Sequence, residues 1–317
     1  MMGREVLVIQ NRDIYGLNIS PLECVKWVDE SFRLKALAQL PPKMSVHPQG
    51  NDFFTSMPCC LPSSYGVFGM KGVHRILGAT PSLGSEILLY DSKSGQLQAL
   101  IDGDWITTMR TGAVAALSIQ HLQRTNTDTY SFMGLGNTAR ATALCLLSIF
   151  SDKKLKFRLL RYKTQAESFI ERFNVSFEIV DTIDHLVSGA DVLISCITDA
   201  QNLICENNEL YRKGLLLVPI HTRGFQNCDL FFDKVYGDDT GHVSGFRYFD
   251  RFKEFDEFGN ILIGKNRGRE NDEQRIVVYN IGLGLHDVVF AYKIHCLLKN
   301  TVSTSFILDK EDEKFWI

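Results

Sequence analysis

Two kinds of hydrophobic pattern follow one another along the chain, and they divide it into two parts. In the N-terminal part, Val25, Val28 and Phe32 recur at helical spacing, and Ser20 is suited to cap a helix that starts after it. We therefore predict an amphipathic helix over residues 21–40. The strands predicted after it cover residues 53–57, 67–70, 86–90 and 96–100, and the last two are joined by a hairpin turn.

From about residue 128 onward, short apolar strands alternate with helices. The predicted strands cover residues 130–134, 156–161, 177–180, 191–196, 215–220 and 234–236. The helix over 138–150 is apolar on nearly every side, so it should be buried against a sheet. This alternation predicts an α/β fold, with a Rossmann-type doubly wound parallel sheet in one domain and an α+β domain before it. A last helix is predicted over 287–300.

The composition argues against several classes of partner. The 317 residues are 45% hydrophobic and 22% charged, which is typical of a folded globular protein. Lys and Arg total 34 against 37 Asp and Glu, so the basic excess typical of nucleic-acid binding is missing. No apolar run approaches the ~20 residues of a membrane span, and the N-terminus does not resemble a secretory signal. We expect a cytoplasmic protein with no nucleic-acid or membrane partner.

Metal binding is not indicated by the spacing of the usual ligands. The eight cysteines contain no Cys-x-x-Cys pair, and the eight histidines contain no His-Glu-x-x-His pattern. We predict no metal site and mostly reduced thiols.

The sharpest local motif is Gly-x-Gly-x-x-Ala, formed by Gly134, Gly136 and Ala139 with Asn137 and Thr138 between them. It follows an apolar strand and opens a helix. In a dinucleotide site, the first glycine allows the tight turn, the second admits the diphosphate, and the small third residue lets helix and strand pack closely. The motif predicts a nicotinamide cofactor here.

The type of cofactor depends on the end of the second strand of this domain. Arg161 lies 22 residues after Ala139, near the position where an acidic residue would bind the adenosine ribose of NAD. Residues 151–165 contain six basic residues, Lys163 among them, and one acidic residue. No carboxylate in this segment would repel a 2'-phosphate, so we favour NADP over NAD. The alternative is a solvated basic edge.

Two basic residues in the N-terminal part are candidates for binding a ligand or transferring a proton. Lys71 is expected to end an apolar strand, between glycines at 69 and 72 that could admit a ligand. Arg110 is expected at a helix start, beside backbone N–H groups, where it could grip a carboxylate. Burial of Lys71 would lower its pKa toward the range useful for proton transfer. Taken alone, each residue is more often a surface charge than part of a site.

Further candidates lie in the C-terminal half. A polar segment over 268–272 is followed by an apolar strand over 276–279, which runs into a glycine-rich turn where the backbone could approach a ligand. Asp287 falls in the first turn of the helix after it, either as a cap or as part of a site. His221 follows the strand over 215–220, where it could face the crevice or be structural.

These blocks, in this order, resemble the ornithine cyclodeaminase/mu-crystallin family over nearly the whole chain. The blocks are Met57 with Pro58, Lys71, residues 107–111 with Arg110, the Gly134 turn and residues 282–287. The resemblance implies a homodimer with a discontinuous substrate-binding and dimerisation domain (1–120 and 288–317). A Rossmann domain (121–287) would be inserted into it. It also implies NAD(H) or NADP(H) as cofactor and amino acids, imines or cyclic ketimines as substrates.

The resemblance also assigns roles. Arg110 would hold the substrate carboxylate, with Lys43 and Met57 nearby, and Lys71 would exchange the proton on the reacting nitrogen, with Asp287 as a further catalytic residue. The residues implied to bind the cofactor are Thr111, Gly134, Gly136, Asn137, Thr138, Ala139, Arg161, Lys163, Cys196, Ile197, Thr198, Ile220, His221, Asn280 and Gly282.

One departure from the family affects the reaction. True ornithine cyclodeaminases carry an acidic residue after the fifth Rossmann strand, and in residues 218–229 the nearest carboxylate is Asp229. Residues 268–272 and 280–287 also look similar to relatives that oxidise an amino-acid conjugate. We therefore predict an NAD(P)-dependent oxidoreductase that transfers hydride at the α carbon of an amino acid, its conjugate or its imine. The alternatives are a redox-neutral deaminating cyclase and a nucleotide-bound protein without enzymatic activity.

Overall fold

A computed structural model of the chain describes residues 4–198 and 200–309. The chain divides into two compact units. The first consists of Met1–Ser20, Leu34–Thr107 and Leu283–Ile317, and the second of Pro21–Arg33 and Thr108–Gly282. In the described part of the chain, no helix combines the length and the apolar character that crossing a membrane requires.

The first unit is built on a largely antiparallel sheet. Its strands are β1 (Arg4–Ile9), β2 (Met44–Val46), β3 (Phe53–Cys60), β4 (Val67–Arg75), β5 (Leu83–Asp91), β6 (Leu97–Asp102) and β15 (Ser305–Leu308). Its helices are α1 (Asn11–Gly16), a 3₁₀ turn (Lys35–Leu37) and α9 (Gly284–Leu298). The strand order is β15-β1-β6-β5-β4-β3-β2, and β1 and β6 run parallel.

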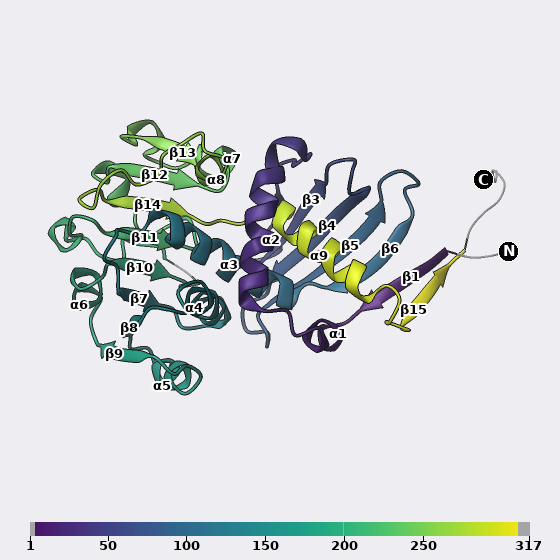
Figure 1. The fold of residues 1–317 in the computed structure, drawn as a ribbon, viewed down its shortest axis with the longest axis horizontal. Coiled ribbons are helices and arrows are strands. Elements are labelled where there is room, and N and C mark those ends of the chain that lie inside the picture. The colour runs from purple at the N-terminus through teal and green to yellow at the C-terminus, as the bar shows by residue number, and fades with distance from the viewer. Residues whose placement is uncertain (1–3, 199, 310–317) are drawn as a thin grey trace. The chain divides into compact units, whose positions relative to one another are not determined.

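Helix α9 covers one face of this sheet over β3, β4 and β5 (Figure 1). The strands alternate accordingly: Ile87 and Leu89 of β5 are fully buried, while Leu88 between them is half-buried on the other face. The contact is close at Gly69, where an added Cβ would lie 2.6 Å from a methyl group of Val288. Gly69 therefore serves the packing of α9 on β4.

The second unit contains a parallel sheet with helices on both faces. Its strands are β7 (Thr129–Met133), β8 (Lys156–Leu160), β9 (Ser176–Val180), β10 (Val192–Ser195), β11 (Leu216–Pro219), β12 (Lys234–Gly237), β13 (Phe255–Glu257) and β14 (Ile276–Tyr279). Its longer helices are α2 (Pro21–Leu34), α3 (Asp104–Leu122), which begins in the first unit, and α4 (Asn137–Ile149). Its shorter helices are α5 (Gln165–Ile170), α6 (Ile183–Ser188), α7 (Thr240–Val243), α8 (Phe258–Leu262) and 3₁₀ turns at Asn208–Leu210, Cys228–Leu230 and Phe249–Arg251.

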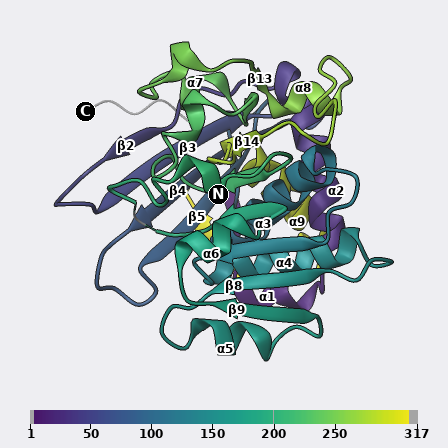
Figure 2. The ribbon, with the colours of Figure 1, turned by 90° about the vertical axis from the view of Figure 1, so that its left-hand side faces the viewer.

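The strand order of this sheet is β13-β12-β14-β11-β10-β7-β8-β9, and β8 and β9 lie toward one edge and β13 at the other (Figure 2). Strands β9 to β11 reproduce the 3-2-1-4-5 order of a dinucleotide-binding fold, and the order reverses between β7 and β10. Both faces of β7 are covered. Met133 packs into a core with Leu186 of α6, while the Tyr130 hydroxyl donates to Gln123 just after α3. The predicted doubly wound parallel sheet is confirmed.

The boundaries of the units differ from the predicted domains. Residues 21–33 and 108–120 were predicted in the first domain, and their contacts place them in the second unit. Helix α2 packs there through Phe32, whose ring meets that of Phe258 edge-on at 5.3 Å. An amphipathic pattern shows that a helix has an apolar face, but it does not show which neighbour covers that face.

Some elements also differ from the predictions. The first predicted helix ends at Leu34 and continues only as the 3₁₀ turn, six residues before the expected end at 40. Strands β1, β2, β13 and β15 were not predicted. Strands β2 and β13 span only three residues each, too short for an alternating pattern to stand out.

Candidate active site

The glycine bend of the second unit lies at the point where the sheet order reverses. Gly134 has φ +76°, and an added Cβ would lie 2.7 Å from the backbone of Cys196 and Ile197 at the end of β10. Both the dihedral and the contact require glycine there. Gly136 is the N-cap of α4, and a Cβ on it would meet no protein atom within 4 Å. Protein packing therefore does not explain Gly136, whereas the approach of a ligand to this backbone would.

The other residues of the Gly-x-Gly-x-x-Ala motif differ in how deeply they are buried. Ala139 is fully buried, as the packing of helix on strand requires, whereas Asn137 is exposed and Thr138 half-buried. Helix α3 lies against α4, because a Cβ on Gly112 would be 2.5 Å from the Ala141 carbonyl carbon. This contact brings Thr111, the neighbour of Gly112, toward the helix that carries the motif.

Arg161, at the end of β8, has acidic partners that the sequence did not reveal. Arg161 donates to Asp181 Oδ1 at 2.7 Å and to Glu167 Oε1 at 2.8 Å. The prediction that no carboxylate at this position would repel a 2'-phosphate therefore does not hold, because Asp181 and Glu167 both bind Arg161. Glu167 lies two residues beyond the segment considered, and β8–β9 pairing brings Asp181 alongside. Lys163, with φ +50°, places its ammonium over the ring of Tyr162.

The ends of β10 and β11 carry a histidine–serine pair. His221 Nε2 and Ser195 Oγ share a hydrogen bond of 2.6 Å, and the Ile220 N–H donates to the Ser195 carbonyl. Burial lowers the pKa of His221 below its ordinary value, which favours the neutral ring. His221 also stacks on Phe225. Of the cofactor residues predicted next to Ser195, Cys196 and Ile197 are half-buried and Thr198 is exposed.

Arg110 packs against the turn that follows β14. It is only 6% exposed, and a Cβ on Gly282 would lie 2.2 Å from its Nη1. Gly282 has φ +98°, so this position too requires glycine. Two turns further along α3, Ser118 donates to Asn280 Oδ1 at 3.1 Å. The sequence prediction placed Arg110 at a helix start, which is wrong: α3 begins at Asp104, so Arg110 lies well inside the helix.

Lys71 and Asp287 form a buried ion pair in the first unit. Both side chains are 0% exposed, and Lys71 Nζ lies 2.8 Å from Asp287 Oδ1. Lys71 Nζ also donates to Thr107 Oγ1 at 3.3 Å, and Thr107 shares a hydrogen bond with Ser85. The side-chain oxygens and the ammonium form one continuous polar network inside an otherwise apolar core.

The positions of these two residues correct part of the sequence reasoning. Lys71 is in the middle of β4 rather than at its end. Of its flanking glycines, Gly69 serves the packing of α9 rather than ligand access. Asp287 is in the first turn of α9, as predicted, but that helix has no side-chain cap, and the carboxylate pairs with Lys71. Of the alternatives left open for Asp287, the cap is not observed.

The other two predicted substrate residues lie on neighbouring strands. Met57 of β3 is the register partner of Lys71 on β4 and is 6% exposed. Lys43 is half-buried and directly precedes β2, whose Met44 pairs with Ser56. The first unit thus gathers Met57 and Lys71 on adjacent strands under the start of α9.

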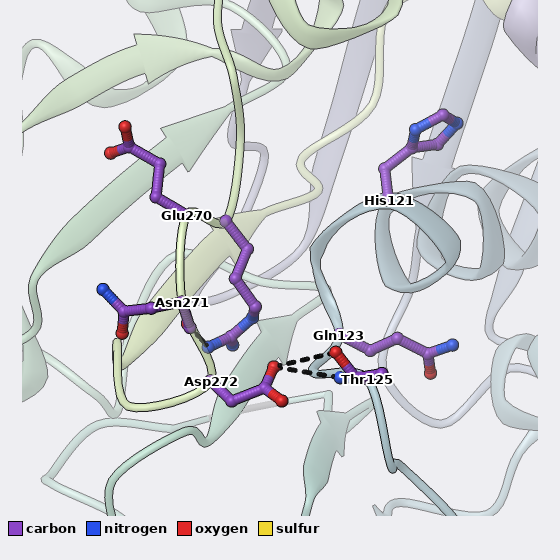
Figure 3. A pocket seen from close by; sticks show the side chains of 7 residues that line it. His121, Gln123, Thr125, Glu270, Asn271 and Asp272 are labelled. Atoms are coloured by element: carbon purple, nitrogen blue, oxygen red, sulfur yellow. Dashed lines mark hydrogen bonds between the residues drawn. The ribbon is translucent and has the colours of Figure 1, made fainter.

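The polar segment at 268–272 is tied to other loops of the second unit by hydrogen bonds. Arg269 donates to the backbone carbonyls of Leu122, Asn271, Gln274 and Gly214. Asp272 accepts from the Thr125 N–H and hydroxyl (Figure 3). These groups border a polar cavity of about 380 Å³, lined by His121, Gln123, Thr125, Arg269, Glu270, Asn271 and Asp272. Their hydrogen bonds serve loop structure, so we assign this segment no chemical role.

The carboxylate nearest to the place of the cyclodeaminase acid is locked in the core. Asp229 is fully buried, and Tyr279 donates to its Oδ1 at 2.7 Å. Burial raises the pKa of Asp229 to about 7, partly offset by this hydrogen bond. Asp229 therefore does not present a charged oxygen to a ligand.

These parts can now be compared with known proteins. The sequence profile of the ornithine cyclodeaminase/mu-crystallin family matches residues 4–301. The chain belongs to the ornithine cyclodeaminase/mu-crystallin family. The resemblance noted in the sequence is thereby confirmed.

Individual members of the family show how broad its activities are. The alanine dehydrogenase of Archaeoglobus fulgidus is 25% identical over 323 residues, covering 94% of this chain and 98% of the relative. The structure of Thermococcus litoralis Δ1-pyrroline-2-carboxylate reductase, in complex with NADH and L-proline, matches with a TM-score of 0.82 and 22% identity, over 94% of this chain and 99% of that one. A probable ornithine cyclodeaminase from Bordetella pertussis matches with a TM-score of 0.81 and 19% identity, over 93% and 98%. These structural likenesses establish the fold and do not separate reductase from cyclodeaminase.

Sequence reasoning missed several polar residues of this family member. Thr107 and Ser85 connect to Lys71, and Ser195 pairs with His221. Asp238 accepts a hydrogen bond from the Gly282 N–H. The Asp238 signal was present, since an acidic residue directly after an apolar strand lies at the carboxyl edge of a parallel sheet.

Proposed function

We propose that the protein is an NAD(P)-dependent oxidoreductase that interconverts an amino acid, or an amino-acid conjugate, and the corresponding imine. The observation that carries this proposal is the Lys71–Asp287 pair. Two fully buried opposite charges are a poor way to stabilise a core, because apolar residues of similar volume do so at least as well. Such a pair is better explained by proton transfer at a bound substrate.

In this proposal Lys71 gives a proton to the substrate nitrogen when the imine is reduced and takes one in the opposite direction. The Asp287 carboxylate stabilises the charged ammonium, and the Thr107 hydroxyl fixes the direction of one N–H bond. Met57, next to Lys71 on β3, and Lys43 border the substrate. Arg110 holds the substrate carboxylate through two parallel hydrogen bonds, which also fixes its orientation.

The residues around the glycine bend fit a dinucleotide. Gly134 provides the turn, Gly136 leaves its backbone open, and the first turn of α4 directs N–H groups toward a diphosphate. When bound, the nicotinamide ring supplies or accepts the hydride at the substrate carbon. We assign the remaining cofactor contacts to Thr111, Asn137, Thr138, Ala139, Cys196, Ile197, Thr198, Ile220, His221, Asn280 and Gly282.

We further propose NADP as the preferred cofactor, with Arg161 and Lys163 binding its 2'-phosphate. Arg161 already has two carboxylate partners, so the phosphate must displace Asp181 or Glu167 from it. These ion pairs are exposed, and exposed pairs contribute only about 0–1 kcal/mol, so a phosphate can replace one.

Cyclodeamination is disfavoured by the surroundings of Asp229. True cyclodeaminases of the family use a carboxylate after the fifth Rossmann strand, and Asp229 is the carboxylate nearest to that place in this chain. Asp229 is instead enclosed with Tyr279 in the core. The oxidoreductase reaction does not need this carboxylate.

We propose that the protein acts as a cytoplasmic homodimer. The face of the first-unit sheet opposite α9 keeps large apolar side chains only half-buried, and Val46 and Phe54 at its edge are exposed. A second copy could cover this face, and the archaeal alanine dehydrogenase structure is described as a dimer. The half-buried apolar residues of this face are Pro58, Phe68, Met70, Leu88, Tyr90 and Leu100.

The proposal is tested by following nicotinamide absorbance with NADP(H) and NAD(H) against L-alanine, L-proline, L-ornithine and the corresponding imines, with ammonia measured in parallel. Absorbance changes that match product formation support the oxidoreductase. Release of ammonia from ornithine without a net absorbance change would instead establish the cyclase. Tight nucleotide binding without any turnover would indicate a binding protein.

A further inference from the structure

A buried carboxylate directly after β12 holds the turn that contacts Arg110. Asp238 is 0% exposed. Its Oδ2 accepts a hydrogen bond from the Gly282 N–H, and its Oδ1 lies 3.0 Å from His242 Nδ1. Both carboxylate oxygens are therefore engaged, one by the turn and one by α7.

The position of Gly282 limits where the Arg110 guanidinium can lie. The 2.2 Å separation between a Cβ built on Gly282 and Arg110 Nη1 means that the guanidinium packs directly on the glycine backbone. A shift of the turn by a few tenths of an ångström would change that contact. Because the Gly282 N–H points to Asp238, the carboxylate sets the position of the surface on which Arg110 packs.

The negative charge of Asp238 matters in addition to its hydrogen bonds. A neutral amide oxygen could accept a hydrogen bond from the same N–H. The hydrogen bond to the turn therefore does not by itself explain why a charged carboxylate is buried here. Arg110, which is 6% exposed, is a buried cation that packs on the same turn, and a buried cation is stabilised by negative charge in its surroundings. His242 is a titratable group that shares a hydrogen bond with Asp238 Oδ1.

We propose that Asp238 is a positioning residue for substrate binding, which acts through the Gly282 turn to orient the guanidinium of Arg110. This inference rests on the proposed function, in which Arg110 binds the substrate carboxylate. Asp238 itself does not touch the substrate. Its removal should therefore weaken recognition of a carboxylate more than it weakens the binding of nucleotide, to which Gly282 is only one of the proposed contacts.

The test compares the binding of pyrrole-2-carboxylate and its uncharged analogue pyrrole-2-carboxamide by calorimetry, with the full-length protein saturated with NADP⁺. The variants are Asp238→Asn, which keeps an acceptor but removes the charge, and Asp238→Glu, which keeps the charge but displaces it. Asp239→Asn is the matched control, because the neighbouring Asp239 is half-exposed and caps α7 through the Gly241 N–H.

We expect the wild-type protein and Asp239→Asn to prefer the carboxylate. In Asp238→Asn this preference should fall by about tenfold, as for loss of a buried charged partner, with an intermediate value in Asp238→Glu. The dissociation constant of NADP⁺ should change by less than this factor in all of them, because Gly282 is one of many proposed cofactor contacts. The Asp238→Asn substitution should also have no further effect on the preference in an Arg110→Ala background.

The outcomes separate this inference from the proposed function. If the wild-type protein shows no preference for the carboxylate, the role of Arg110 is wrong and the inference falls with it. If the wild-type preference is clear but Asp238→Asn keeps all of it, only the inference is overturned. If Asp238→Asn does not fold, Asp238→Glu decides, and an unchanged preference there overturns the inference as well.

Discussion

The Asp287→Asn substitution is the most informative single change, because it should weaken both stability and catalysis for one reason. Lys71 and Asp287 are both 0% exposed, so the variant leaves the Lys71 ammonium in the core without its counter-charge. Breaking a buried pair by removing one partner costs about 3–5 kcal/mol. Thr107, which is itself hydrogen-bonded to Ser85, remains as a polar neighbour of the ammonium, so we expect the lower end of this range, about 3 kcal/mol.

The assay must report on the first unit alone, because a chain of two compact units need not unfold in a single step. Hydrogen exchange of peptides from β4 and α9 meets this requirement. A loss of about 3 kcal/mol corresponds to roughly 100-fold lower protection in these two elements. Peptides from β7 and β10 in the second unit should change little.

Two further variants test the reasoning. The double variant Lys71→Met with Asp287→Asn removes both charges, so most of the protection should return while turnover stays absent. Asp29→Asn breaks an exposed ion pair with Arg33 and should change stability by less than about 1 kcal/mol. Unchanged protection in Asp287→Asn, or equal losses in the single and double variants, would refute the assignment of a buried, charged pair.

Three other predictions concern the second unit. Gly134→Ala should abolish nucleotide binding in a calorimetric titration, because φ is +76° and the new Cβ would lie 2.7 Å from the Cys196 backbone; wild-type affinity would contradict the proposed cradle. Asp181→Asn should increase the affinity for NADP relative to NAD several-fold by releasing Arg161, whereas Arg161→Ala should decrease it; equal changes for both nucleotides would exclude Arg161 from phosphate recognition. Burial raises the pKa of Asp229 from 3.8 to about 7, so the folded state binds an extra proton between these values. Stability should therefore fall as the pH rises from about 4 to about 7, by an amount on the order of 4 kcal/mol, and then level off. Urea midpoints measured against pH should lose this slope in Asp229→Asn, and an identical slope in that variant would show that another group is responsible.

The sequence predicted best those features that depend on neighbours along the chain. The turn at Gly134 followed a recognisable strand and preceded an apolar helix, and all three are present as expected. The alternation of strands and helices after residue 128 was sufficient for the parallel sheet, because few other arrangements bury such strands on both faces.

Features that depend on distant neighbours could not be predicted. Lys71 and Asp287 are 216 residues apart, and either could have been a surface charge or a helix cap until their distance was known. Asp181 reaches Arg161 only because β8 pairs with β9 in a particular register. The contact between Arg110 and Gly282 joins a helix to a turn far along the chain, and its closeness follows from tertiary packing rather than local propensity.

The family resemblance and the structure contributed different information about the candidate catalytic residues. The motif order suggested roles for Lys71, Arg110 and Asp287, while the structure adds a physical reason for Asp287, which is the counter-charge of Lys71. Neither the family resemblance nor the sequence reasoning singled out Asp238, because its importance depends on the Gly282 N–H that it binds.

The most direct test of the proposed reaction is to follow the hydride itself. Reduced nicotinamide coenzyme carrying deuterium at both hydrogen positions of its reactive carbon is incubated with the protein and Δ1-pyrroline-2-carboxylate, or with pyruvate and ammonium, and the amino acid formed is analysed by mass spectrometry. We predict that one deuterium appears at the α carbon of the product and that Lys71→Met abolishes its formation. An amino acid formed without deuterium would contradict hydride transfer by this protein.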